Sequence, residues 1–92
     1  MNFDTSLLDK SGITQAELAW LSKVSRVTAG KWARGSGVHS LLEARVRKLS
    51  AALGAAIDAN DLPLPSGVDH VATPKYGNVR PDLAKVLRKH LG

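Results

Sequence analysis

Apolar residues recur every three or four positions over much of the chain, a spacing that places them on one face of an α-helix. The longest such stripe consists of Leu42, Val46, Leu49 and Leu53. It predicts a helix over Ser40 to Leu53, with Ser40 and Glu43 as a capping box and Gly54 as its C-terminal cap. A stripe of this length is more typical of core packing than of a coiled-coil seam.

Two shorter helices are predicted upstream of this stripe. Thr14 followed by Glu17 has the S/T-x-x-E spacing of a capping box, in which each side chain bonds the other residue's free amide. The pair predicts a helix from Gln15 to Ser22. The small Ala19 lies on the inward face of that helix and lets a second helix cross closely, because it adds no bulk.

The second helix is expected from Arg26 to about Ala33. Ser25 precedes it as a hydroxyl N-cap. Helical spacing points Trp32 and either Val27 or Ala29 to the core. The remaining positions of this helix are small, polar or basic: Arg26, Thr28, Gly30 and Lys31.

The flanking segments give weaker signals. Phe3 to Lys10 predicts a first helix, with Asp4 or Thr5 as its cap. Trp20 lies at the edge of its helix, either as a lid over the core or as a contact to a partner. Ala55 to Leu62 form a short further helix or continue the preceding one, before prolines stop it.

A proline-bounded segment from Pro63 to Pro74 predicts a linker. Val68 to Ala72 and Lys75 to Val79 would pair as short edge strands, with the turn at Thr73 and Pro74. Pro81 then suits the first turn of a final helix to Leu91. The apolar face of that helix must pack against its own domain or against a second copy.

The two short helices resemble the helix-turn-helix of the lambda-repressor-like superfamily, the phage Cro and repressor group also called the XRE family. The family's usual run is TQ-x-ELA-x-x-L-G-V-S-x-x-T-V-S-x-W-E-x-G. The matching residues here are Thr14, Gln15, Glu17, Leu18, Ala19, Leu21, Val24, Ser25, Thr28, Trp32 and Gly35. The resemblance covers roughly Leu7 to Leu62.

Three positions depart from the family's run. Lys23 replaces the usual turn glycine, Ala29 replaces a larger apolar residue, and Ala33 replaces the usual glutamate. A left-handed turn residue other than glycine costs on the order of 1 kcal/mol, which a packed domain absorbs.

In this family the second helix enters the major groove of DNA, and the resemblance implies roles for individual residues. Base contacts fall at Arg26, Val27, Gly30 and Lys31. Phosphate contacts fall at Gln15, Lys23, Ser25, Thr28, Arg34 and Ser36. A guanidinium can bond guanine O6 and N7 together, which gives about 1–3 kcal/mol of discrimination. Gly30 weakens its helix by roughly 1 kcal/mol relative to alanine, so either a close approach to DNA or simple tolerance explains it.

The net charge of +5 is unevenly distributed. Residues 23–48 carry seven basic side chains against Glu43, and residues 75–92 carry five against Asp82. The other two stretches, residues 1–22 and 49–74, are net acidic. Positive charge therefore gathers on the second short helix and the segment after it, and again near the C-terminus, a placement that suits a phosphate backbone.

Other classes of function find little support. The chain has no cysteine, which excludes a disulfide scaffold and a zinc finger and favours a reducing, cytoplasmic compartment of a bacterial cell or phage-infected host. We expect neither a membrane-spanning helix nor a signal peptide. His39, His70 and His90 are scattered without metal-ligand spacing. No nucleophile elbow or phosphate-cradling loop occurs, so we expect neither an enzyme nor a cofactor.

We therefore expect an all-α, compact five-helix helix-turn-helix domain over residues 1–62. Residues 63–92 would be a C-terminal extension for dimerisation or for a protein partner. The expected function is sequence-specific binding of double-stranded DNA by a small Cro-like repressor, acting as a homodimer on a palindromic operator. An antitoxin that neutralises a toxin protein and autoregulates by binding DNA is the main alternative. An architectural factor that bends DNA is a third possibility. RNA binding is less favoured than these functions, because the chain has few aromatic residues to stack on bases.

Overall fold

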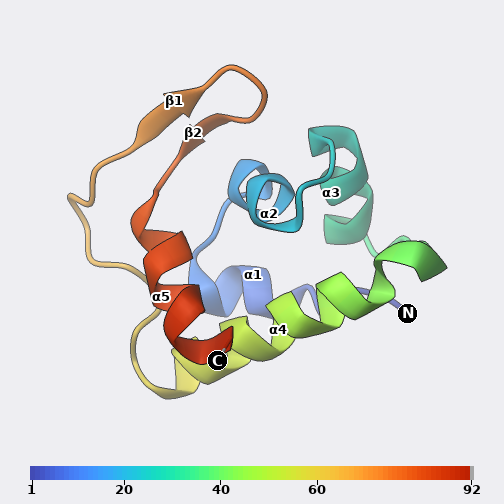
Figure 1. Ribbon diagram of the computed structural model, residues 1–92, viewed down its shortest axis with the longest axis horizontal. Coiled ribbons are helices and arrows are strands. Elements are labelled where there is room, and N and C mark those ends of the chain that lie inside the picture. Colours follow the sequence, from blue (N-terminus) through green and yellow to red (C-terminus); the bar gives the residue numbers. More distant parts are fainter. Residues whose placement is uncertain (92) are drawn as a thin grey trace.

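The computed structural model describes residues 1–91, which form five α-helices, one 3₁₀ turn and a two-stranded antiparallel sheet (Figure 1). In chain order the elements are α1 (Ser6–Ser11), α2 (Gln15–Ser22), α3 (Arg26–Ala33), η1 (Ser40–Leu42), α4 (Glu43–Asp58), β1 (Val71–Thr73), β2 (Gly77–Val79) and α5 (Asp82–Leu91). The chain is compact and mostly helical. The expected all-α class is wrong in the strict sense, because the two short strands pair as a sheet.

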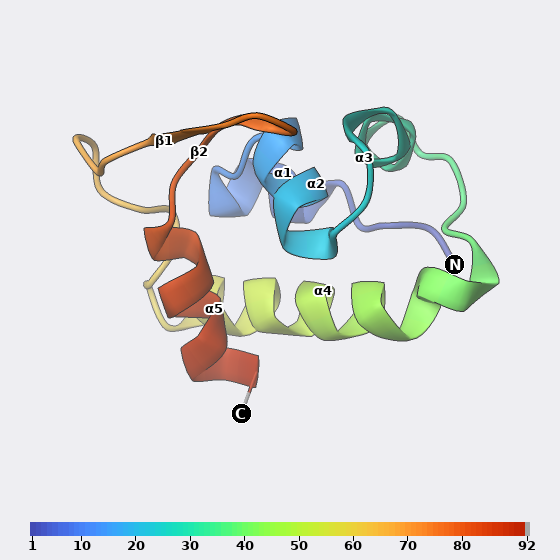
Figure 2. The same ribbon diagram turned by 45° about the horizontal axis from the view of Figure 1, so that its top comes forward.

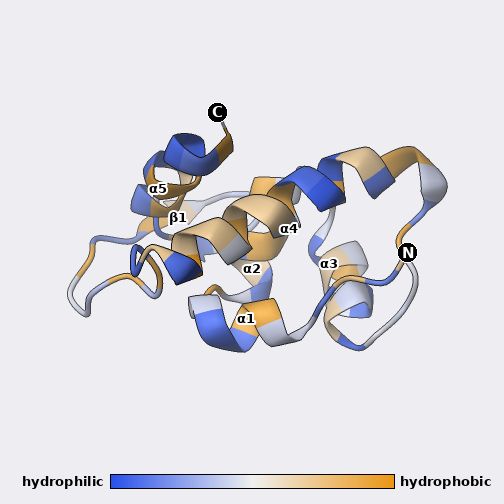
Figure 3. Cartoon of the chain, turned by 90° about the horizontal axis from the view of Figure 1, so that it is seen from below, coloured by the Kyte–Doolittle hydropathy of each residue, from blue (hydrophilic) through white to orange (hydrophobic). Residues whose placement is uncertain are grey.

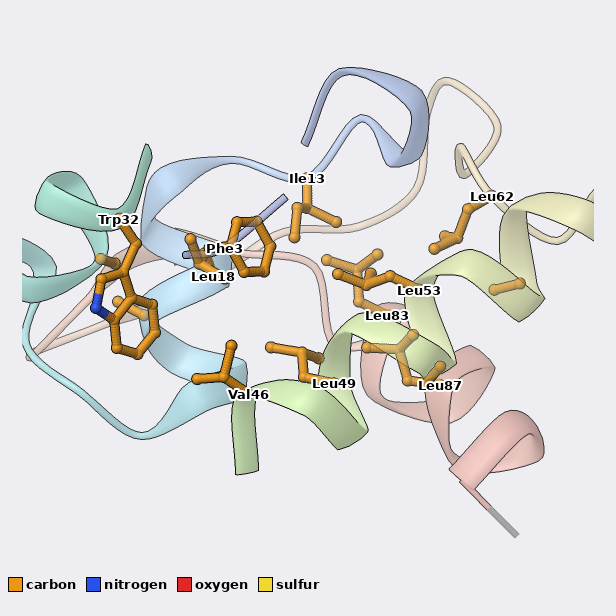
Figure 4. Close-up of a cluster of buried hydrophobic side chains, with 14 of the residues drawn as sticks. Phe3, Ile13, Leu18, Trp32, Val46, Leu49, Leu53, Leu62, Leu83 and Leu87 are labelled. Carbon is orange, nitrogen blue, oxygen red and sulfur yellow. The ribbon is translucent and has the colours of Figure 1, made fainter. Parts of the chain in front are cut away.

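The longest helix, α4, is the base on which the other elements pack. Figure 2 shows α1, α2 and α3 on one side of α4, and α5 crossing its C-terminal half. The close-up in Figure 4 shows the side chains that fill the space between them. Eight of them, from four helices and two loops, are each at most 3% exposed: Phe3, Leu18, Trp32, Val46, Leu53, Leu62, Leu83 and Leu87.

The helix α4 differs from its prediction at both ends. The capping box of Ser40 and Glu43 does not form; residues 40–42 make a 3₁₀ turn, and Glu43 Oε1 instead accepts a hydrogen bond of 3.1 Å from the Met1 amine. At the other end, Gly54 lies inside the helix, which continues to Asp58. The predicted apolar stripe does face the core, and hydrophilic and hydrophobic segments alternate along α4 in Figure 3.

The first helix begins at Ser6, three residues later than predicted. Asp4 Oδ1 accepts a hydrogen bond from the Ser6 amide at 3.0 Å, and α1 begins at Ser6. Phe3 therefore lies outside the helix, although its side chain is buried in the core as expected. Its neighbour Asn2 pairs with Gly37, which ties the N-terminal segment to the loop after α3.

The C-terminal segment folds back onto the rest of the chain. Val71 pairs with Val79 and Thr73 with Gly77, so the turn of the hairpin spans residues 74–76 rather than Thr73 and Pro74. The helix α5 buries Leu83 and Leu87 against α4. Of the two expectations for its apolar face, packing within its own chain is therefore the one observed.

Candidate nucleic-acid interface

The helices α2 and α3 are positioned by their caps and by small residues at their crossing. Thr14 Oγ1 accepts from the Glu17 amide at 3.1 Å and Glu17 Oε1 accepts from the Thr14 amide at 2.9 Å, so the predicted capping box is confirmed. The turn between the helices is made by Lys23, whose φ of 58° is left-handed. Ala19 and Ala29 are fully buried between them.

This packing turns one face of α3 outward. Trp32 is buried with Ala29, whereas Val27 is 67% exposed, so the core position is Ala29 and not Val27. The exposed face has a hollow of about 390 Å³ that opens to solvent. It is lined by Gln15, Arg26, Val27, Gly30 and Arg34, which we call the basic groove. Five residues predicted to contact DNA therefore come together in one place.

Gln15 gives a structural reason for Gly30. The Gln15 side-chain amide crosses from the start of α2 to α3, where Nε2 donates to the Arg26 carbonyl at 3.2 Å. A Cβ atom at Gly30 would lie 2.7 Å from that same nitrogen. Glycine is therefore needed at this position for the glutamine to lie flat on α3, an explanation that neither sequence-based interpretation of Gly30 included.

The cations of this face have no partner among the described residues. Within residues 1–91 no carboxylate lies within 4.0 Å of Arg26, Lys31 or Arg34. By contrast, Arg45 donates to the Ser22 carbonyl at 3.1 Å and so caps the end of α2. The positive charge of α3 is therefore available to an anionic ligand.

The other predicted phosphate contacts lie around the groove without lining it. Ser25 caps α3, and its hydroxyl donates to Thr28 Oγ1 at 3.0 Å, which leaves the Thr28 hydroxyl proton free to bond elsewhere. Lys23 and Ser36 are exposed. The Ser36 amide bonds the Lys31 carbonyl at 2.9 Å, so this loop offers a hydroxyl but not that amide to a phosphate.

A buried ion pair joins α2 to the residue after β2 and was not predicted. Arg80 Nε donates to Glu17 Oε2 at 2.8 Å and Arg80 Nη2 donates to Glu17 Oε1 at 2.8 Å. The Arg80 amide adds a third bond to Oε2 at 2.9 Å, and Nη2 also reaches the Gly12 carbonyl at 2.8 Å. The Glu17 side chain is 1% exposed. We call this the Glu17–Arg80 clamp; no local sequence signal joins residues so far apart.

The clamp determines the charge state of its carboxylate. Burial raises the pKa of the Glu17 carboxyl, but the hydrogen bonds from Arg80 and from the Thr14 amide outweigh burial and hold the pKa below its ordinary value of 4.5. Glu17 is therefore ionised at neutral pH, and its charge is neutralised by Arg80 rather than exposed beside the basic groove.

Neither a metal site nor a membrane span stands out in the described structure. Over residues 1–91, no three His, Cys, Asp or Glu side chains come together as metal ligands would. None of the helices in that range combines the length and apolar character needed to cross a bilayer.

Comparisons of the chain with protein-family models, with curated proteins and with solved structures found no match. The resemblance of α2 and α3 to the lambda-repressor-like helix-turn-helix therefore depends on the motif residues between Thr14 and Gly35 and stays a prediction.

Proposed function

We propose that this chain is a helix-turn-helix regulator that binds specific sequences in double-stranded DNA, in the manner of a small Cro-like phage repressor. The basic groove is the observation that carries the proposal. It gathers the Gln15 side chain of α2 and Arg34 beside Arg26 and Val27 of α3, with no carboxylate among residues 1–91 within 4.0 Å of its cations.

The dimensions of α3 suit the major groove. An α-helix with its side chains is about 10–12 Å across, and the major groove of B-DNA is about 12 Å wide and admits one. Arg26 and Val27 lie on its first turn, where a guanidinium reads guanine and an apolar side chain meets a thymine methyl group. Arg34 follows at the other end, where it would contact a phosphate.

Gln15 would hold the adjacent DNA strand. Its Nε2 is engaged with the Arg26 carbonyl through one N–H, which leaves the second N–H free for a phosphate oxygen. Because Gln15 is also the first residue of α2, its backbone amide lies at the positive end of that helix. The Gln15 side chain would thus join α3, the helix that reads the bases, to the phosphate backbone of the DNA.

One helix of this length reads only a few base pairs, so we propose a two-fold dimer on a palindrome with half-sites about 34 Å apart. Leu91, at the end of α5, is 50% exposed and offers apolar surface to a second copy. It borders a small hollow with Leu21 and Leu49. Occupying an operator would repress transcription by excluding polymerase.

Selection of binding sites from a randomised duplex pool at about physiological salt tests the proposal. Specific binding survives this salt concentration, whereas purely electrostatic binding weakens. We expect a palindrome with half-sites one helical turn apart. Failure to enrich any sequence would contradict the proposal and favour a protein partner, such as the toxin of a toxin–antitoxin pair, which co-purification would then identify.

A further inference from the structure

The β1–β2 hairpin lies on the same side of the molecule as the basic groove. Figure 2 shows the hairpin running over α2 with its tip directed toward α3. A Cβ atom added to Gly77, the first residue of β2, would lie 3.8 Å from Arg26 Nη1. The hairpin and the first turn of α3 therefore form one continuous surface, although they are far apart in sequence.

The hairpin is held in this position from its inner side. Val79 is 1% exposed, and the half-buried Tyr76 packs against the core. The Glu17–Arg80 clamp fixes the next residue along the chain from β2 to the start of α2. Thr73 closes the turn, since its hydroxyl donates to the Gly77 carbonyl at 2.8 Å and accepts from the Tyr76 amide at 3.0 Å.

The tip of this hairpin carries the chemistry of a phosphate contact. Lys75 is exposed, and its Nζ lies 5.5 Å from the centre of the Tyr76 ring, a cation–π distance that restrains the ammonium group. Asn78 is exposed on β2. Residues 71–79 contain no acidic side chain, so nothing within the hairpin itself repels a phosphate.

We propose that the hairpin tip, Lys75 together with Asn78, is a second DNA contact that binds the phosphate backbone beside the groove entered by α3. This inference builds on the proposed function. Charge complementarity favours the DNA backbone as the partner of the tip. Arg26 has no carboxylate partner among residues 1–91, and the tip extends its positive charge along the same surface. The hairpin would then fix the angle at which α3 meets the duplex, as phosphate contacts commonly do.

Site-directed cleavage tests the placement of the tip. The chain has no cysteine, so Lys75→Cys creates a single attachment point for an iron chelate that cuts nearby DNA. We expect cuts at one flank of each half-site of the selected duplex. Lys85→Cys, on α5, is the matched control and should give none. A Lys75→Cys protein that binds the duplex but leaves it uncut would overturn the inference and leave the proposed function intact.

The salt dependence of binding gives the second readout. Losing one phosphate contact lowers the slope of log K against log salt by about 0.9, which corresponds to about fivefold weaker binding at 0.15 M salt and no difference near 1 M. We expect this from Lys75→Ala and no change from Lys85→Ala. Equal slopes for the two variants would refute the hairpin contact. Absence of binding by the unaltered chain would instead overturn the proposed function, and the hairpin contact with it.

Discussion

Two residues of α2, Gln15 and Glu17, mark two regions of opposite character. Glu17 faces inward, is buried, and accepts four hydrogen bonds within 3.0 Å, three of them from Arg80. Gln15 faces outward, is exposed, and makes one longer bond of 3.2 Å. The arginine beside it, Arg26, has no carboxylate partner among residues 1–91, whereas Arg80 bonds the Glu17 carboxylate through Nε and Nη2 and the Gly12 carbonyl through Nη2.

The contrast separates the residues that hold the fold from those free to bind a ligand. A buried charge that loses its partner destabilises the folded state, because the remaining charge cannot reach water. An exposed arginine without a partner has little folded-state interaction to lose. Substitutions in the clamp should therefore change stability, and substitutions in the basic groove should change binding alone.

The largest effect is expected from Arg80→Met, which leaves the Glu17 carboxylate buried and unpaired. Breaking a buried ion pair costs about 3–5 kcal/mol of unfolding free energy, measured by urea denaturation. Adding Glu17→Gln should recover much of this loss, because it removes the stranded charge. Lys85→Ala is the control and should stay within about 0.5 kcal/mol. A single Arg80→Met variant as stable as the control would show that the clamp contributes nothing.

Arg26→Ala should affect binding and not folding. We expect about 1–3 kcal/mol less discrimination at one base position of the selected site, with stability within about 0.5 kcal/mol of the unaltered chain. Affinity measured against all four bases at each position checks this. An equal loss for every base would mean that Arg26 contacts phosphate.

Arg34→Ala should weaken all duplexes alike. The loss of one phosphate contact predicts about fivefold lower affinity at 0.15 M salt and a salt slope reduced by about 0.9. Titration of the selected site and of an unrelated duplex at several salt concentrations measures both. A loss of affinity confined to the selected site would mean that Arg34 contacts bases rather than phosphate.

Gly30→Ala tests whether Gln15 depends on its glycine. The alanine adds about 1 kcal/mol of helix propensity but displaces the Gln15 amide and its hydrogen bond. Stability should therefore change by less than about 0.5 kcal/mol, while affinity falls about fivefold for the lost contact of about 1 kcal/mol. In a Gln15→Ala background the same substitution should leave affinity unchanged, as a double-mutant cycle will report.

The smallest effect is on the pH dependence of stability. Because the pKa of Glu17 is held below 4.5 by Arg80 and Thr14 despite its burial, the unfolded chain binds the proton more readily. Its stabilisation is present above pH 4.5 and is lost as the pH falls through the folded-state value. The unfolding free energy of Glu17→Gln should therefore fall less steeply below pH 4.5. Hydrogen bonds from Ser6 and from His90 also lower the pKa values of Asp4 and Asp61, but both groups remain in the variant.

The elements predicted best are those whose signals are local. The helices α2 and α3 begin at the predicted residues because Thr14 and Ser25 cap them from within four positions. The same logic failed at Ser40 and Glu43, where the spacing is right but the Met1 amine bonds the glutamate. Gly54 was misread as a helix end because its neighbours Leu53 and Ala56 bury enough apolar surface to continue α4.

Part of the candidate site was also predicted, because the signals for that part are local in the sequence. The family pattern named all five residues that line the basic groove, since they belong to two neighbouring helices. It did not connect Gln15 to Gly30, because that contact depends on the angle at which the helices cross. The hairpin beside Arg26 and the Glu17–Arg80 clamp depend on tertiary packing that no short sequence window contains.

The clamp joins residues 63 positions apart, so it also bears on how the molecule assembles. Contacts between α2 and α3 close short loops and form early, whereas contacts of high sequence separation are slow to form. We expect the hairpin to dock after the helices have packed, when Arg80 reaches Glu17. A nascent chain would therefore lack the hairpin part of the proposed DNA-binding surface, and would complete that surface only after Arg80 has been synthesised.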